Sequence, residues 1–128
     1  MVAITLTEKL IEGGKCLIEE LDTSGIKVNG ALWIFFQEEG FWKLMLSFPD
    51  VDKSGPKSAY SKVQKALSKL TKKDGLSLDD IAIAKSSSPL LHLLKKVVHT
   101  GTGISGIRFS NNVVNGQLIA DAYIYRLI

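Results

Sequence analysis

The dipeptide Asn115-Gly116 constrains the fold of this chain more than any other feature, because it stands between two apolar runs near the C-terminus. Asn-Gly favours the positive φ angles that a two-residue hairpin turn requires. We therefore expect a strand over residues 107 to 113, a tight turn, and a last strand over 118 to 127. Such a turn also fixes the register. The predicted facing pairs are Val114 with Gln117, Ser110 with Asp121, and Arg108 with Tyr123.

This register divides the predicted hairpin into two faces of different character. The side that we assign to the core carries Ile107, Phe109, Val113, Leu118, Ala120, Ala122 and Ile124. The opposite side carries Arg108, Ser110, Asn112, Asp121, Tyr123 and Tyr125. Tyrosine and arginine are enriched where proteins contact partners, and aromatic platforms bind single-stranded nucleic acid. Arg108, Asp121, Tyr123 and Tyr125 are therefore candidate binding residues, with an ordinary solvated sheet face as the alternative.

A second hairpin is predicted around Glu38-Glu39-Gly40, between the aromatic-rich runs 30 to 37 and 41 to 48. Pairing Gln37 with Phe41 makes both of its faces largely apolar. One face carries Leu32, Ile34, Phe36, Trp42, Leu44 and Leu46, and the other carries Trp33, Phe35, Phe41, Lys43 and Met45. Because a solvated sheet face normally alternates apolar with polar residues, the second face needs a cover, either a helix or another chain. We expect Trp33, Phe35 and Met45 to form a face for self-association.

Helical patterns account for the rest of the chain. A first helix is predicted to begin at a capping box of Thr5 and Glu8, with Gly13-Gly14 marking close packing or a local break. After a loop from 49 to 55, Pro56 begins a second helix that runs to about residue 73. A short strand over 81 to 85 and a third helix over 89 to 99 follow. The expected order is αββαβαββ, a single α+β domain over residues 1 to 128 with two antiparallel hairpins, a short strand and three helices.

Positive charge is concentrated in the second helix. Residues 53 to 73 contain seven lysines and no acid, whereas residues 1 to 52 contain nine acids and four lysines. The helical period places Lys62, Lys65, Lys69, Lys72 and Lys73 within roughly 100° of one another. Clustered lysines favour binding to the phosphates of nucleic acid or to another polyanion, because such binding releases counterions. Docking onto an acidic patch and a plain solvated helix face are the alternatives.

No motif indicates catalysis, a cofactor or a metal. The segment 101 to 106 matches the letters of the dinucleotide-binding fingerprint, but a helix is predicted before it and a strand after it, the reverse of what that site needs. Glycines with positive φ in this connection explain the pattern without a ligand. His92 and His99 lie about 10 Å apart along one helix, too far to bind one metal together.

Compartment and partners are also constrained by the sequence. The longest uninterrupted apolar run, 31 to 36, is far shorter than the roughly 20 residues of a membrane-spanning helix. No signal peptide is recognisable, and the lone Cys16 is typical of a reducing compartment. We expect a cytoplasmic protein without a membrane partner.

Three stretches together carry a resemblance. They are the aromatic hairpin, the turn from Asp52 to Pro56 leading into a helix with Tyr60, and the closing sequences 103 to 110 and 121 to 127. In these the chain resembles a group of small bacterial proteins without an assigned activity. The resemblance covers nearly the whole chain and implies a bacterial, cytoplasmic, single-domain protein.

Three functional hypotheses follow from these patterns. The first is a non-catalytic interaction module that acts as a homo-oligomer or as a subunit of a larger bacterial assembly, through surplus apolar sheet surface. The second is a nucleic-acid-binding or nucleotide-binding protein that uses the lysine-rich helix and the face of Arg108, Tyr123 and Tyr125. The third is a small enzyme whose residues converge from distant segments, with Asp121, Arg108 and His99 as first suspects.

Overall fold

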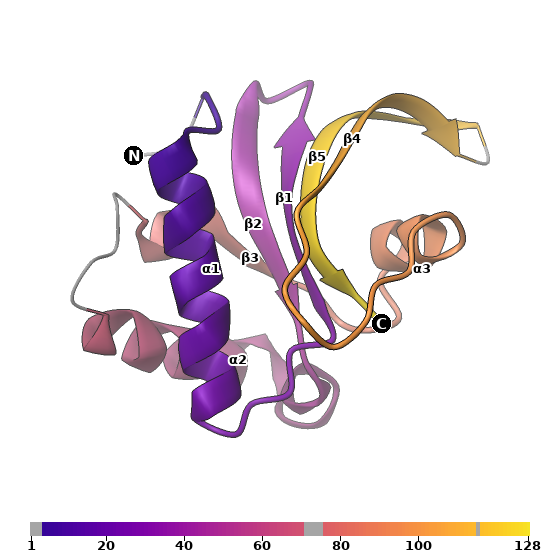
Figure 1. Ribbon diagram of the computed structural model, residues 1–128. Coiled ribbons are helices and arrows are strands. Elements are labelled where there is room, and N and C mark those ends of the chain that lie inside the picture. The colour runs from indigo at the N-terminus through magenta and orange to yellow at the C-terminus, as the bar shows by residue number, and fades with distance from the viewer. Residues whose placement is uncertain (1–3, 71–75, 115) are drawn as a thin grey trace.

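In the part of the chain that it describes, residues 4–70, 76–114 and 116–128, the computed structural model contains three helices and one mixed sheet of five strands (Figure 1). The side chains of Asp50 and Asp52 are outside this description. The α+β class is confirmed, and the order differs from the expected one by a 3-10 turn, η1. The elements are α1 (Glu8–Thr23), β1 (Gly30–Phe36), β2 (Phe41–Ser47), α2 (Pro49–Lys69), η1 (Leu78–Asp80), β3 (Ile81–Ile83), α3 (Pro89–Lys95), β4 (Ile107–Val114) and β5 (Gln117–Leu127).

The sheet joins the two hairpins through β1, in the strand order β3-β2-β1-β5-β4. β1 pairs antiparallel with both β2 and β5, and the short β3 lies parallel to β2. β1 is apolar along almost its whole length and is buried from Gly30 to Ile34, as expected of a strand covered on both faces. β1 is therefore the central strand of the sheet.

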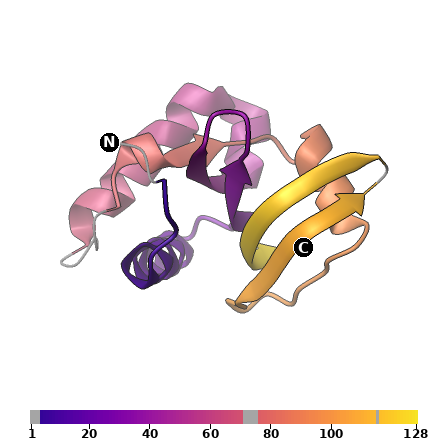
Figure 2. The same ribbon diagram turned by 90° about the horizontal axis from the view of Figure 1, so that it is seen from above.

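Helices cover both faces of the sheet. Apolar side chains of α1 and α2 pack with Trp33, Leu44 and other residues on one face. Leu91 and Leu94 of α3 pack with Leu32, Met45 and other residues on the other. Figure 1 shows α1 and α3 on opposite sides of the sheet, and Figure 2 shows the far ends of β4 and β5 curving toward α3. Both sheet faces are therefore core faces.

The predicted register of the β4–β5 hairpin is confirmed. Val114 faces Gln117, and Ser110 faces Asp121. The predicted core side is correct only up to the middle of β4, where Asn111 has a φ of +50°. Beyond Asn111, the side chains that point into the core come from the side of the hairpin predicted to be exposed. Val113 and Leu118 are 67% and 50% exposed, contrary to expectation, whereas Val114 and Ile119 are buried.

The predicted register of the β1–β2 hairpin is wrong by one residue. Phe36 faces Phe41, and Gly40, with a φ of +74°, donates its backbone N–H to the Phe36 carbonyl across a four-residue loop. Because side chains alternate between the two faces of a strand, this shift moves all of β2 to the opposite side of its partner. Leu44 therefore faces Trp33, and Met45 faces Leu32.

The expected self-association face of Trp33, Phe35 and Met45 is therefore wrong. Trp33 is fully buried, and Phe35 packs against the same core beneath α1 and α2. Met45 is 8% exposed and lies in the core on the α3 side. The helices of the chain itself cover the apolar surface that suggested another chain.

The first helix begins two residues later than predicted. Thr7, not Thr5, is the N-cap, and its Oγ1 accepts a hydrogen bond from the backbone N–H of Leu10 at 3.2 Å. Gly14 stays helical inside α1 because it lies against the sheet: a Cβ there would stand 2.5 Å from the Tyr125 hydroxyl oxygen. Close packing therefore explains this glycine.

The segment 49 to 55, predicted to be a loop, is helical over residues 49 to 54. α2 begins at Pro49, and a non-helical Gly55, with a φ of +83°, separates its first turns from the part that begins at Pro56. Val63, Ala66 and Leu67 of the second part are buried against the sheet. α3 ends at Lys95, shorter than predicted. Lys57, Lys65 and Lys69 are exposed, so the lysine-bearing face of α2 points away from the sheet.

Candidate functional site

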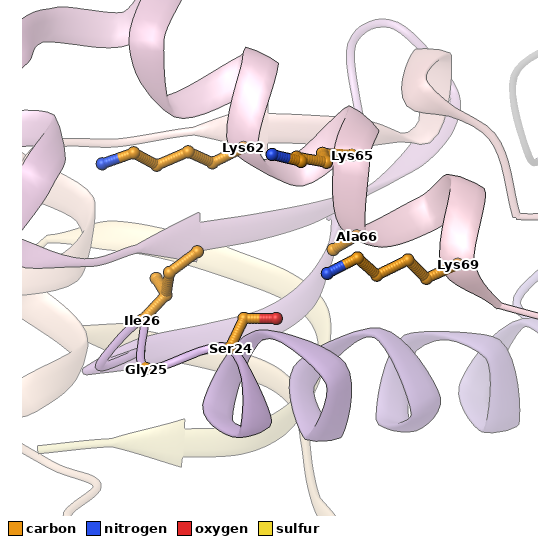
Figure 3. A pocket seen from close by; sticks show the side chains of 7 residues that line it. All are labelled: Ser24, Gly25, Ile26, Lys62, Lys65, Ala66 and Lys69. Atoms are coloured by element: carbon orange, nitrogen blue, oxygen red, sulfur yellow. The ribbon is translucent and has the colours of Figure 1, made fainter.

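The lysines of α2 line a hollow between that helix and the end of α1. The hollow has a volume of about 430 Å³ and is lined by Ser24, Gly25, Ile26, Lys62, Lys65, Ala66 and Lys69. Figure 3 shows the three lysine side chains projecting from successive turns of α2 above the turn that follows α1. Gly25 has a φ of +84°, which lets the chain reverse tightly there. The structure thus brings together three of the five lysines that the helical period placed on one face.

A second hollow continues the first along α2. It measures about 540 Å³ and is lined by Ser54, Lys57, Ser58, Ser61, Lys62 and Lys65. Lys62 and Lys65 belong to both hollows, so the two form one strip. No acidic side chain is among the described residues that line either one. Lys72 and Lys73 lie outside the described residues, and Lys57 is the addition that the structure makes to the predicted set.

Arg108 and Asp121 form a two-pronged ion pair across the β4–β5 ladder. Arg108 Nε donates to Asp121 Oδ1 at 2.6 Å, and Nη2 donates to Oδ2 at 2.5 Å. Ser110 Oγ also donates to Asp121 Oδ1, at 2.7 Å. The hydrogen bond from Arg108, with smaller help from Ser110, holds the pKa of Asp121 below its usual value, and the same pair raises the pKa of Arg108.

The guanidinium of Arg108 also stacks on an aromatic ring. Its central carbon lies 5.5 Å from the centre of the Trp42 ring, a cation–π contact. Asp121 already neutralises the charge of the Arg108 guanidinium and accepts hydrogen bonds from two of the Arg108 nitrogens. Arg108 and Asp121 are placed together as predicted, and their strongest contacts are with each other and with the chain itself.

Tyr123 and Tyr125 are not a surface platform. Tyr125 is 1% exposed, accepts a hydrogen bond from Trp33 Nε1 at 3.0 Å and donates one to the Ile11 carbonyl at 2.6 Å. Burial raises the pKa of its phenol well above the ordinary value. Tyr123 packs edge-on against Tyr125 at the rim of the same core. The predicted binding face fails here because α1 lies across it.

Sequence reasoning missed Arg126, the most deeply buried cation of the described residues. Its Nη1 and Nη2 donate to the Asp22 carboxylate at 3.0 and 2.9 Å, and Nη1 also donates to the Val28 carbonyl at 3.0 Å. Nε donates to the Gly103 carbonyl at 3.3 Å. The sequence feature that could have indicated a buried cation is an arginine within the otherwise apolar run 122 to 128. These bonds join β5, the end of α1 and the glycine-rich segment.

The glycine-rich segment lies beside the end of β5. The backbone N–H of Thr100 donates to the Leu127 carbonyl, and that of Ser105 to the Tyr125 carbonyl. It follows α3 and precedes β4, as predicted, so its context differs from that of a dinucleotide site. The expectation of positive φ is wrong, since Gly101, Gly103 and Gly106 all lack it. Gly106 is instead required by the hydroxyl of Tyr123, which fills the space of a side chain.

Within residues 4–70, 76–114 and 116–128 there is no group of three or more His, Cys, Asp or Glu side chains that could hold a metal ion. None of the helices in those ranges is both long and apolar enough to cross a membrane.

Comparison of the chain with models of protein families, with curated proteins and with solved structures finds no match. The resemblance to small bacterial proteins stays an expectation.

Proposed function

We propose that the chain is a binding module, without a reaction of its own, whose ligand is an anionic polymer bound along the lysine-lined strip of α2. The single observation that carries this proposal is the pair of adjoining hollows lined by Lys57, Lys62, Lys65 and Lys69. Lysines clustered along one helix face create a positive potential that attracts an anion.

Hydroxyl groups add directional contacts to this charge. The two hollows include Ser54, Ser58 and Ser61, whose hydroxyls can donate to anionic oxygens. Ser24 also lines the first hollow, but its Oγ donates to Glu20 Oε2 at 3.1 Å. An interaction module based on outward apolar sheet surface has less support, because Trp33 and Met45 are buried within the chain. The Arg108–Asp121 pair is internally neutralised and adds little to binding of an anion.

Heparin binding tests the proposal with two variants of equal charge. Lys62→Gln, Lys65→Gln and Lys69→Gln together remove three charges from the strip and reduce the formal net charge from +3 to about zero. The control triple Lys9→Gln, Lys85→Gln and Lys96→Gln also removes three charges, from exposed lysines elsewhere in the chain. We expect the strip variant to elute from heparin at much lower salt than the wild type, and the control to elute near it. Equal loss in both would overturn the proposal, because net charge alone would then explain retention.

A homo-oligomer is a second candidate function, favoured by the outer strand of the sheet. β4 pairs with β5 on one side only, and such an edge can pair with another strand. Val113 and Leu118 face each other across the ladder near its tip, and both are exposed. We propose that a second copy pairs with β4 there.

Sedimentation at micromolar concentration tests this candidate. Val113→Lys places a charge on the edge and should convert a dimer to a monomer. Val97→Lys is the control, since Val97 is 51% exposed just beyond α3. A wild-type protein that sediments as a monomer would remove the candidate.

A further inference from the structure

We infer that the anionic polymer is a single strand of nucleic acid, held through its phosphates and not through its bases. This inference rests on the proposed function and adds the class of ligand. It follows from the residues that line the strip, from the shape and length of the strip, and from the charge of the neighbouring helix.

The lining favours phosphate over carboxylate as the bound group. Its cations are lysines alone, and the remaining polar side chains are serines. Lysine is a common phosphate binder that acts as a point charge, whereas the planar fork of arginine makes two-pronged contacts with carboxylate or phosphate. Lysine and serine are also among the usual contacts to phosphate oxygens in nucleic-acid complexes.

The shape of the strip favours a narrow chain. The first hollow lies between α2 and the turn that follows α1 (Figure 3), and the second is a shallower depression along α2. A flat membrane surface does not enter such a hollow, and the apolar lining is limited to Ile26 and Ala66, too little for insertion into lipid. A single strand is narrow enough to lie along it.

The neighbouring helix disfavours a duplex. A helix with its side chains is about 10–12 Å across, and a whole B-DNA duplex, whose major groove alone is about 12 Å wide, is broader than that. A duplex on α2 therefore extends over α1, which packs beside α2. The exposed side chains of α1 include Glu8, Glu12 and Glu19, and these carboxylates repel a second phosphate strand.

The length of the strip sets the size of the binding site. Lys57 and Lys69 are twelve residues apart on the continuous part of α2, about 18 Å at 1.5 Å per residue. At about 3.4 Å per nucleotide, the spacing along one stacked strand, this distance spans about five nucleotides. The lining contains no aromatic side chain among its described residues, so bases have nothing to stack on. Binding should therefore not depend on sequence.

Fluorescence anisotropy with labelled poly(dT), poly(dA), their duplex and heparin tests the inference. We expect the two single strands to bind alike and about tenfold more tightly than the duplex. Oligonucleotides shorter than about five nucleotides should lose affinity steeply, since fewer phosphates then reach the lysines. The salt dependence should have a slope of at most about 2.8, since each phosphate contact to a single strand contributes about 0.7 and the strip offers four lysines.

Variants assign the binding to the strip. The triple Lys62→Gln, Lys65→Gln and Lys69→Gln should bind poly(dT) at least about tenfold more weakly, with a salt slope near 0.7. The triple Lys9→Gln, Lys85→Gln and Lys96→Gln is the matched control and should keep the wild-type slope. Because Lys62 is half-buried, Lys57→Gln with Lys65→Gln is a second variant at exposed positions, with an expected slope near 1.4. Circular dichroism confirms that each variant is folded.

The outcomes separate this inference from the proposed function. Binding to heparin through the same lysines, with duplex bound as tightly as single strand, would overturn the single-strand inference and leave the proposed function in place. Binding to vesicles of phosphatidylserine, with no binding to heparin or to either single strand, would overturn both, because the ligand would then be a lipid surface and not an anionic polymer. Loss of heparin binding no larger in the strip variant than in the control would overturn both.

Discussion

Gly14, in the middle of α1, lies against the hydroxyl of Tyr125 in the last strand. A Cβ on Gly14 would stand 2.5 Å from that oxygen and 3.0 Å from the indole nitrogen of Trp33. The helix can approach the sheet this closely only where it has no side chain. This contact positions α1 over the Tyr125–Trp33 hydrogen bond.

Replacing Gly14 with alanine should destabilise the protein. The methyl group must displace a buried, hydrogen-bonded tyrosine, and such overpacking costs about 1–3 kcal/mol. The better helix propensity of alanine offsets up to about 1 kcal/mol of this cost. We expect the free energy of unfolding in urea to fall by about 1–2 kcal/mol.

Gly101→Ala is the control for that measurement, because nothing lies within 4 Å of a Cβ there and its φ is not positive. Its stability should stay within about 0.5 kcal/mol of the wild type. A Gly14→Ala variant as stable as the wild type would show that Tyr125 moves aside freely.

Removing the hydroxyl of Tyr125 should also destabilise the protein. Tyr125→Phe leaves the Trp33 N–H and the Ile11 carbonyl without their partner, and an unsatisfied buried polar group costs about 1–3 kcal/mol. Tyr123→Phe is the matched control, since its hydroxyl lies against Gly106 at the rim of the core. Urea unfolding followed by tryptophan fluorescence compares them, and an equal loss in both variants would contradict the assigned role.

Asp22 should contribute more to stability than the other acids of α1. Asp22→Ala leaves the guanidinium of Arg126, which is 5% exposed, without its counter-charge. Because the Asp22 side chain is itself 37% exposed, we expect a loss of about 2–3 kcal/mol, at the lower end for a broken buried pair. Glu19→Ala, at an exposed position one turn earlier, should change stability by less than about 0.5 kcal/mol. Equal effects in chemical denaturation would show that the Asp22–Arg126 pair contributes nothing particular.

The Arg108–Asp121 pair should make stability depend on pH. Because the folded pKa of Asp121 lies below its unfolded value of about 3.9, the carboxylate stabilises the folded state above that pH. This contribution disappears as the pH falls through the folded pKa.

Asp121→Asn measures this contribution. Arg108 is 52% exposed, so solvent screens the pair and we expect the variant to be about 0.5–1 kcal/mol less stable at neutral pH. The difference should shrink toward zero in acid, as urea unfolding at a series of pH values would show. A difference that persists unchanged in acid would mean that packing, and not charge, is involved.

Local chemistry determined a large part of what the sequence predicted correctly. The Asn115-Gly116 turn specified the β4–β5 register because a two-residue loop leaves no freedom in pairing, although Asn115 itself lies outside the described residues. Periodicity placed Lys62, Lys65 and Lys69 on one side of a helix because the helical repeat needs no knowledge of the rest of the chain. The α+β class followed from the same local patterns.

Where both faces of a strand are apolar, the apolar pattern could not determine the register. The β1–β2 pair is such a case, since a shift of one residue still offers apolar side chains to both cores. The four-residue loop also permits more than one geometry, unlike the Asn-Gly turn. The inward side reverses at Asn111, a polar residue that interrupts the predicted core side between Phe109 and Val113.

Only the tertiary structure decided which distant segments meet. The two hairpins join through β1 and β5, Arg126 meets Asp22 across 104 residues, and Gly14 meets Tyr125. The turn at Gly25 also completes the lysine hollow from outside α2. The sequence by itself determined what each segment forms and which side of it is charged, because turns and helical repeats are short-range. The covering of Tyr125 and the concavity of the strip depend on how helices pack on a sheet, which is set by contacts between residues far apart in the chain.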